Sequence, residues 1–173
     1  MTTIKEILYV LLDNYAEHEI DFLPEAVNTD EQGFRKERKY ANKIVAPTLG
    51  PVKSIGGMRT LPDYSFESMP EDYAALVLIG GYGWMTAEAD GVVPIVKQAL
   101  SKGIIVGGIC NAVSWMAKQG LLNNIKHTGN GIDQLKLWGG DNYTNEGGYL
   151  NEQIYAICWA ATLNRKVVFE IMR

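Results

Sequence analysis

The chain contains few of the residues that build metal centres and disulfide frameworks. Its 173 residues include two cysteines, Cys110 and Cys158, and two histidines, His18 and His127. Two widely separated thiols do not make a disulfide scaffold, and together with two histidines they do not make a zinc site. We therefore predict no metal centre, and the scarcity of cysteine favours a reducing, cytoplasmic location.

Excess positive charge and long apolar runs are absent as well. The chain has 16 Lys and Arg residues against 20 Asp and Glu residues, which gives a formal net charge of −4 at pH 7. The densest basic cluster, residues 35–39, is typical of the solvated end of a helix. No apolar segment reaches membrane-spanning length, and the first residues lack the layout of a signal peptide. We expect neither a nucleic-acid partner nor a membrane partner.

What the chain does contain is an alternation of strand patterns and helix patterns. Continuous apolar runs, typical of strands covered on both faces, occupy residues 7–12, 73–79 and 104–109. Amphipathic helix patterns occupy residues 17–28, 92–102 and 111–119. A further strand and a small hairpin are predicted within 43–63, and Pro24 is expected to kink the first helix or delay its start.

This alternation predicts an α/β fold with a doubly wound, mostly parallel sheet and helices on both faces, a flavodoxin-like three-layer sandwich. Length and the lack of a linker predict a single domain over 1–173. In such sheets ligands bind beyond the carboxyl ends of the strands. We therefore look for chemistry in the loops 13–19, 80–85 and 109–112, which are expected to converge.

Cys110 stands where the strand pattern ending at Ile109 changes at once into a helix pattern. A turn of this kind holds its central residue in a strained conformation and presents the side chain at the end of the sheet. The N-terminus of the following helix favours the thiolate form. We predict that Cys110 is a nucleophile, whereas Cys158, in an apolar segment with no turn, is predicted to be an inert core residue.

Glu19 and the Gly80-Gly81 pair belong to the two loops that are expected to meet Cys110. A carboxyl at Glu19 would hold its proton beside a thiolate and donate a hydrogen bond to sulfur, although the same position also suits a partner of the helix dipole. Gly81 would present its backbone N–H to a developing oxyanion, or the pair would form a plain turn.

The two histidines are weaker candidates. His18 flanks Glu19 and is expected to point away from it. His127 follows the nucleophile helix and is the histidine suited to a Cys–His dyad, with a surface or strand position as the alternative.

No cofactor is predicted. The glycines at 80–83 lack the third glycine of a dinucleotide fingerprint, and no helix pattern starts there. The loop after the first strand lacks the hydroxyl-rich, glycine-containing cradle that a flavodoxin would need.

These motifs together resemble the class I glutamine amidotransferase-like superfamily, and more closely its PfpI branch, which includes proteases, amidases and deglycases. The resemblance covers about residues 4–150. It implies that Cys110 is the elbow cysteine, that the protonated carboxyl of Glu19 contacts its sulfur, and that Gly81 and Asn111 supply the backbone oxyanion donors. It also implies a homodimer.

The chain departs from this family in three places. Many relatives carry a histidine shortly after the nucleophile helix, where this chain has Asn130, with His127 three residues earlier. Protease-like members have histidine directly after the cysteine, where this chain has Asn111. Both departures weaken the case for a Cys–His hydrolase and leave His127 and Asn130 as accessory candidates.

The third departure is the tail, residues 151–173, which lacks the family's closing pattern of strand, turn and helix. It either forms these elements with altered residues, is rearranged, or covers a partner surface.

Three functions remain open. The first is a hydrolase or amidotransferase-like enzyme that acts on a small amide or carbonyl compound, with Cys110 as nucleophile and Glu19 beside it. The second is a redox-sensing or stress-response protein in which Cys110 is oxidised next to a protonated carboxyl. The third is a non-catalytic binding module, with Tyr15, Tyr82 and Trp84 near the mouth of the pocket.

Overall fold

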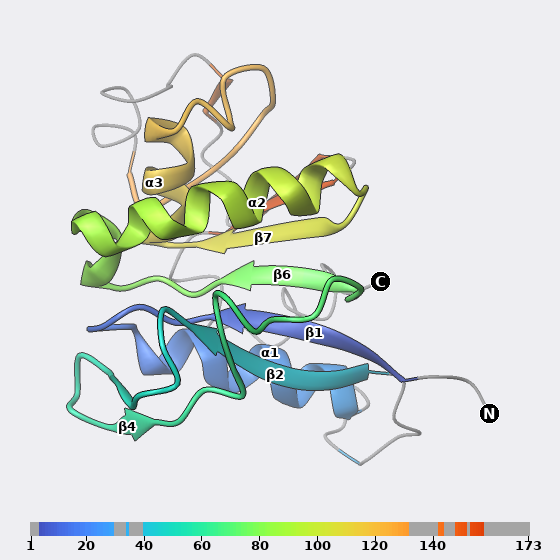
Figure 1. Cartoon of the computed structure of the whole chain (residues 1–173). Coiled ribbons are helices and arrows are strands. Elements are labelled where there is room, and N and C mark those ends of the chain that lie inside the picture. Colours follow the sequence, from blue (N-terminus) through green and yellow to red (C-terminus); the bar gives the residue numbers. More distant parts are fainter. Residues whose placement is uncertain are drawn as a thin grey trace.

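A mostly parallel sheet forms the middle layer of the protein (Figure 1). The computed structural model describes residues 4–29, 34, 40–131, 142–143, 148–151 and 153–157. Within that part of the chain the sheet has seven strands in the order β5-β2-β1-β6-β7-β9-β8. The bounds are β1 Lys5–Val10, β2 Tyr40–Ala46, β5 Tyr64–Ser65, β6 Ala75–Leu78, β7 Ile105–Ile109, β8 Gly148–Asn151 and β9 Ile154–Ile157. Neighbouring strands are parallel except β8 and β9, which are antiparallel.

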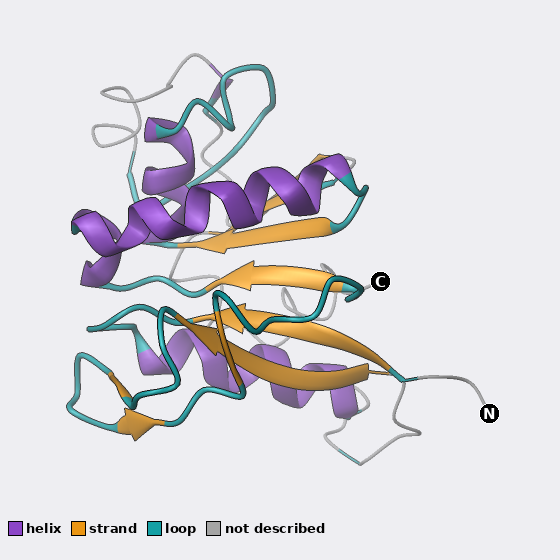
Figure 2. Ribbon diagram, viewed as in Figure 1, coloured by secondary structure: helices purple, strands orange, loops and turns teal. Residues whose placement is uncertain are grey.

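Helices cover both faces of the sheet. Helix α1 (Glu17–Asn28) lies on one face, and α2 (Val92–Ser101) and α3 (Asn111–Lys118) lie on the other (Figures 1 and 2). The two faces form separate apolar cores, because successive residues of a strand point to opposite sides. In β1, Leu8 and Val10 join the core under α2 and α3, while Ile7 and Tyr9 join the core under α1. The predicted α/β sandwich is confirmed.

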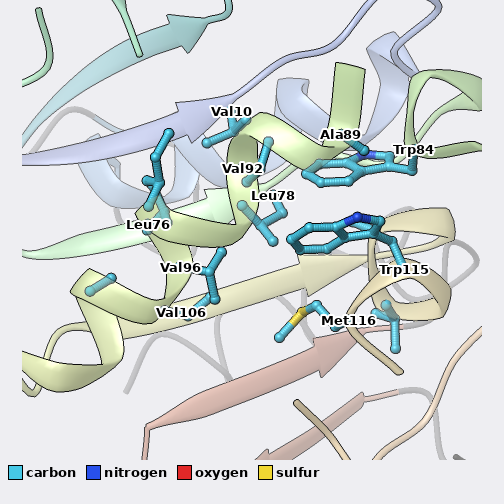
Figure 3. Packing of buried hydrophobic residues seen from close by; sticks show 14 of the residues in the cluster. Val10, Leu76, Leu78, Trp84, Ala89, Val92, Val96, Val106, Trp115 and Met116 are labelled. Atoms are coloured by element: carbon cyan, nitrogen blue, oxygen red, sulfur yellow. The ribbon is translucent and has the colours of Figure 1, made fainter. Parts of the chain in front are cut away.

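The core under α2 and α3 also fixes the loop that follows β6. Trp84 and Trp115 pack with ring centroids 5.0 Å apart and a tilt of 50° (Figure 3). The indole Nε1 of Trp84 donates to the carbonyl of Ile79 at 2.5 Å. Tyr15 and Trp84 are both buried, so the expectation that they lie at a pocket mouth was wrong. Tyr82 is exposed.

The loop after β6 contains two short 3₁₀ helices that the sequence pattern did not predict. They are η1 (Tyr82–Met85) and η2 (Ala87–Gly91), and the first begins directly after Gly81. Gly81 has φ of +142°, and a Cβ there would collide with backbone atoms of Asn14 and Tyr15. Glycine therefore allows the chain to pass close over the loop after β1 and enter the 3₁₀ turn.

Helix α1 runs over its predicted bounds without a break at Pro24. The side-chain amides of Asn28 and Asn42 both donate to the Pro24 carbonyl, at 3.3 and 2.9 Å. The first hydrogen bond lies within the second half of α1, and the second connects that half to β2.

The remaining described elements are a hairpin within 49–61 and the last described strand. Strands β3 (Val52–Lys53) and β4 (Arg59–Thr60) form the small antiparallel hairpin that the sequence predicts. In the tail, β9 pairs in parallel with β7. Cys158 and the residues after it lie outside the described part of the chain. No helix in the described part is long and apolar enough to cross a membrane.

Candidate active site

Cys110 occupies the junction between β7 and α3. Its φ of +57° and ψ of −124° place it in a region that costs a non-glycine residue about 1–3 kcal/mol. The N–H groups of Val113 and Ser114 donate to the Cys110 carbonyl, at 3.1 and 3.4 Å, so the first turn of α3 forms directly on the strained residue. Gly108 leaves room for the side chain of Met116 from α3, since a Cβ there would lie 2.6 Å from the sulfur of Met116. The sharp strand-to-helix turn expected from the sequence is present.

The side chain of Glu19 lies fully buried at the N-terminal end of α1 and faces Cys110. Its Oε2 accepts a hydrogen bond from the backbone N–H of Gly80 at 2.7 Å. A Cβ on Gly80 would collide with the Glu19 carboxyl and lie 2.6 Å from Cβ of Cys110. The missing side chain at Gly80 therefore allows the acid and the thiol to meet.

Burial dominates the electrostatics of this pair. Desolvation raises the pKa of Glu19 to about 7, although hydrogen bonds with Cys110 and Gly80 lower it in part. Desolvation and the negative charge of Glu19 raise the pKa of the Cys110 thiol to about 12. The helix N-terminus led us to expect the opposite direction for the thiol. Burial outweighs the opposing hydrogen bonds from Asn130 and the Asn111 backbone.

Asn130 is the side chain from the loop after α3 that reaches the sulfur. Its Nδ2 donates to Sγ of Cys110 at 2.9 Å. His127 is fully buried and makes its contacts elsewhere, with Nδ1 on the Ile125 carbonyl at 3.0 Å and its ring edge-on to Tyr143. An amide cannot accept the thiol proton, so Asn130 orients the sulfur without acting as a base.

The backbone of Asn111 makes a hydrogen bond with the Cys110 thiol, and Gly81 lies against the loop after β1. Tyr15 and Gly81 form an isolated antiparallel β-bridge. On its two sides, the N–H of Ala16 donates to the Gly80 carbonyl and the N–H of Tyr82 donates to the Asn14 carbonyl. In such a pair the N–H of Gly81 is directed away from the chain that carries Tyr15. The side-chain amide of Asn111 donates to the Gly81 carbonyl at 3.1 Å, which ties the two segments together.

The hairpin of β3 and β4 holds the loop that leads into α1. The N–H of Ile55 donates to the Tyr15 carbonyl at 2.9 Å, and the N–H of Gly56 donates to Oε1 of Glu17 at 2.9 Å. The hydroxyls of Tyr15 and Thr60 lie 2.6 Å apart. Sequence reasoning missed this support, because most of these contacts use backbone atoms that carry no residue signature.

His18 does not point away from Glu19 as expected. Its Nε2 lies 3.9 Å from Oε1 of Glu19. The described residues hold no group of three or more His, Cys, Asp or Glu side chains arranged to bind a metal ion.

The chain is similar to known proteins over most of its length. The model of the DJ-1/PfpI family matches residues 5–154. The chain belongs to the DJ-1/PfpI family. Two proteins of Bacillus subtilis (strain 168) are similar in sequence. The uncharacterized protease YdeA is 38% identical over 128 residues, and the uncharacterized protease YoaZ is 26% identical over 140 residues.

This DJ-1/PfpI chain spans only part of those two relatives. The matched region is 73% of this chain but 60% of YdeA, and 79% of this chain but 65% of YoaZ. Solved structures of the superfamily match more fully. The DJ-1 superfamily protein Atu0886 from Agrobacterium tumefaciens is 25% identical, with a TM-score of 0.80 over 97% of this chain and 88% of the other. A thiJ/pfpI family protein from Bacillus anthracis is 23% identical, with a TM-score of 0.83 over 99% and 82%, which supports the fold.

Proposed function

We propose that this chain is a thiol-dependent enzyme that acts on a small carbonyl or amide compound, with Cys110 as nucleophile and Glu19 as its acid–base partner. One observation carries the proposal: a fully buried carboxyl whose pKa is raised to about 7 faces the sulfur of a strained elbow cysteine. A general base is most effective when its pKa lies near the working pH. Glu19 meets that condition at neutral pH.

The raised pKa of the thiol makes this partner necessary. A thiol with a pKa of about 12 is almost wholly protonated at pH 7. The ionised carboxylate of Glu19 takes the proton from Sγ as sulfur attacks. The carbon–sulfur bond forms, the electron pair of the carbonyl double bond moves to oxygen, and the N–H groups of Gly81 and Asn111 hold the oxyanion.

The fate of this intermediate depends on the substrate. With an α-oxoaldehyde, protonated Glu19 returns its proton to the oxyanion, and a hemithioacetal results. Glu19 then takes the proton from the former aldehyde carbon, the neighbouring carbonyl carbon is protonated in turn, and a 2-hydroxyacyl thioester remains on Cys110. With an amide, the carbon–nitrogen bond breaks, the leaving nitrogen takes the proton from Glu19, and a thioester remains on Cys110. Water then cleaves the thioester with Glu19 as base.

Turnover of α-oxoaldehydes and small primary amides, in the parent and in Cys110→Ala, tests the proposal. We expect the parent to consume at least one class and Cys110→Ala to lose at least about 1,000-fold of that rate. Cys158→Ala is the matched control and is expected to retain the parent rate. Parent turnover that survives in Cys110→Ala, or no turnover of either class by the parent, would contradict the proposal.

Oxidation of Cys110 is the second candidate, because the protonated carboxyl of Glu19 and the amide of Asn130 are both placed to donate to sulfinate oxygens. The raised thiol pKa slows oxidation, since the thiolate is the species that reacts. Mass spectrometry of the intact chain after peroxide treatment separates the two functions. An enzyme is expected to turn over substrate before peroxide and lose activity in proportion to sulfinate.

Three further expectations are proposals. The family resemblance implies a homodimer, the scarcity of cysteine favours a cytoplasmic location, and length with the lack of a linker favours a single domain over 1–173. Light scattering on a sizing column tests the first, with a dimer mass expected.

A further inference from the structure

His18 lies close to the buried acid, and part of its side chain is exposed to solvent. Its Nε2 atom is buried and lies 3.9 Å from Oε1 of Glu19. Nevertheless 43% of the His18 side chain is exposed, whereas the Glu19 side chain has no exposed surface. The imidazole ring therefore spans the boundary between a carboxyl without access to water and the solvent outside.

The two oxygens of Glu19 face different neighbours. Oε2 accepts from the Gly80 N–H at 2.7 Å, and Oε1 lies toward His18. Among the described residues, the ionisable groups recorded next to this carboxyl are His18 from α1 itself and Cys110 from the end of β7. Glu17, on the same turn of α1, is engaged by the Gly56 N–H of the hairpin. The loop after β6 contributes the backbone N–H of Gly80.

We propose that His18 is the proton relay between Glu19 and solvent. Neutral imidazole accepts a proton at one ring nitrogen while it releases another from the second nitrogen, so it carries a proton without net change in charge. Here the proton leaves Oε1 of Glu19 for Nε2 of His18, and Nδ1 gives its proton to water. The relay requires a ring rotation that shortens the 3.9 Å gap to hydrogen-bond length. The reverse sequence reprotonates Glu19.

This relay rests on the proposed acid–base role of Glu19 and deepens it. The acid must regain its starting protonation state whenever substrate or product carries a proton away, and its full burial blocks direct exchange with water. His18 acts through Glu19 and contacts no substrate in this scheme, so it is a positioning and relay residue.

Nuclear magnetic resonance of the Glu19 carboxyl carbon in ¹³C-glutamate-labelled protein tests the relay. The resonance is assigned by its absence in Glu19→Gln. At pH 7, relaxation dispersion gives the rate at which the carboxyl exchanges its proton. We expect this rate to fall at least about tenfold in His18→Gln and to return when millimolar imidazole is added. Glu17→Gln, on the same turn, is the matched control and is expected to keep the parent rate.

An exchange rate in His18→Gln equal to that of the parent would overturn the relay. A reduced rate that imidazole fails to restore would also overturn it, because His18 would then only shape the site. His18→Asn, a second polar substitution at this half-exposed position, is expected to behave like His18→Gln. The measurement needs no substrate, so absence of turnover refutes the proposed function and leaves the relay to be judged by exchange alone.

Discussion

Replacing Glu19 by Gln separates the two things that the carboxyl does to Cys110. Gln keeps the shape and an oxygen that accepts from the Gly80 N–H, but it cannot take a proton. The charge of Glu19 helps to raise the pKa of the thiol to about 12, so Glu19→Gln lowers the pKa of Cys110. Thiolate becomes more abundant in the variant while the base is lost.

We expect turnover at pH 7 to fall despite the extra thiolate. General base catalysis contributes about 100-fold to 10,000-fold, which corresponds to about 3–5 kcal/mol of transition-state stabilisation. The parent profile of kcat/KM against pH should rise through a midpoint near 7, where Glu19 ionises. In Glu19→Gln this midpoint should disappear, and the remaining activity should follow the ionisation of the thiol.

The assay is kcat/KM from pH 5 to 10, with iodoacetamide alkylation of Cys110 measured in parallel. Glu17→Gln is the control, because that side chain contacts the hairpin and its amide oxygen still accepts from the Gly56 N–H. A kcat/KM of Glu19→Gln at pH 7 that equals or exceeds that of the parent would refute the reasoning, since Glu19 would then only suppress a reactive thiol.

The buried acid also sets a pH dependence of folding stability. The folded pKa of Glu19 is raised from 4.5 to about 7, so the folded state loses stability as pH rises through this window, by up to about 3 kcal/mol. Denaturant unfolding should therefore find Glu19→Gln more stable than the parent at pH 8 but not at pH 4. An equal difference in the free energy of unfolding at the two pH values would contradict this. Gly80→Ala should abolish turnover and cost about 1–3 kcal/mol in thermal unfolding, because its Cβ meets Cys110. The Cβ of Gly103→Ala meets nothing within 4 Å, so this control should stay active, although its φ of +74° makes alanine strained there and lowers stability as well. Equal activity of the two variants would argue against the close approach. Asn130→Ala removes a hydrogen bond that lowers the thiol pKa, so alkylation of Cys110 at pH 8 should slow. A faster alkylation would show that Asn130 shields the sulfur instead.

The alternation of strands and helices was enough to predict which loops converge. Cys110, Glu19 and Gly81 each follow a parallel strand, and the arrows of β1, β6 and β7 end at one edge of the sheet (Figure 1). The bounds of α1 were predictable from apolar spacing, even with Pro24 inside. Local patterns succeed here because a strand buried on both faces has a continuous apolar run, whereas a helix buried on one face has apolar residues at a spacing of about 3.6.

Contacts made by irregular segments were not predictable. Asn130 reaches the sulfur from a loop with no regular period, and His127, chemically the more suggestive residue, packs elsewhere. The thiol pKa was expected in the wrong direction, because the helix N-terminus is visible in sequence and desolvation is not. The orientation of His18 was missed for a related reason. A helix pattern does not predict the rotamer of a half-buried ring in the first turn of the helix.

The protonation midpoint of the Glu19 carboxyl tests the account most directly. A titration of its ¹³C resonance from pH 3 to 9 in the unmodified protein requires no substrate and no assumption about the reaction. We predict a midpoint near 7, set by burial beside Cys110. A midpoint near the ordinary glutamate value of about 4.3 would mean that the acid is solvated and is not the base of this site.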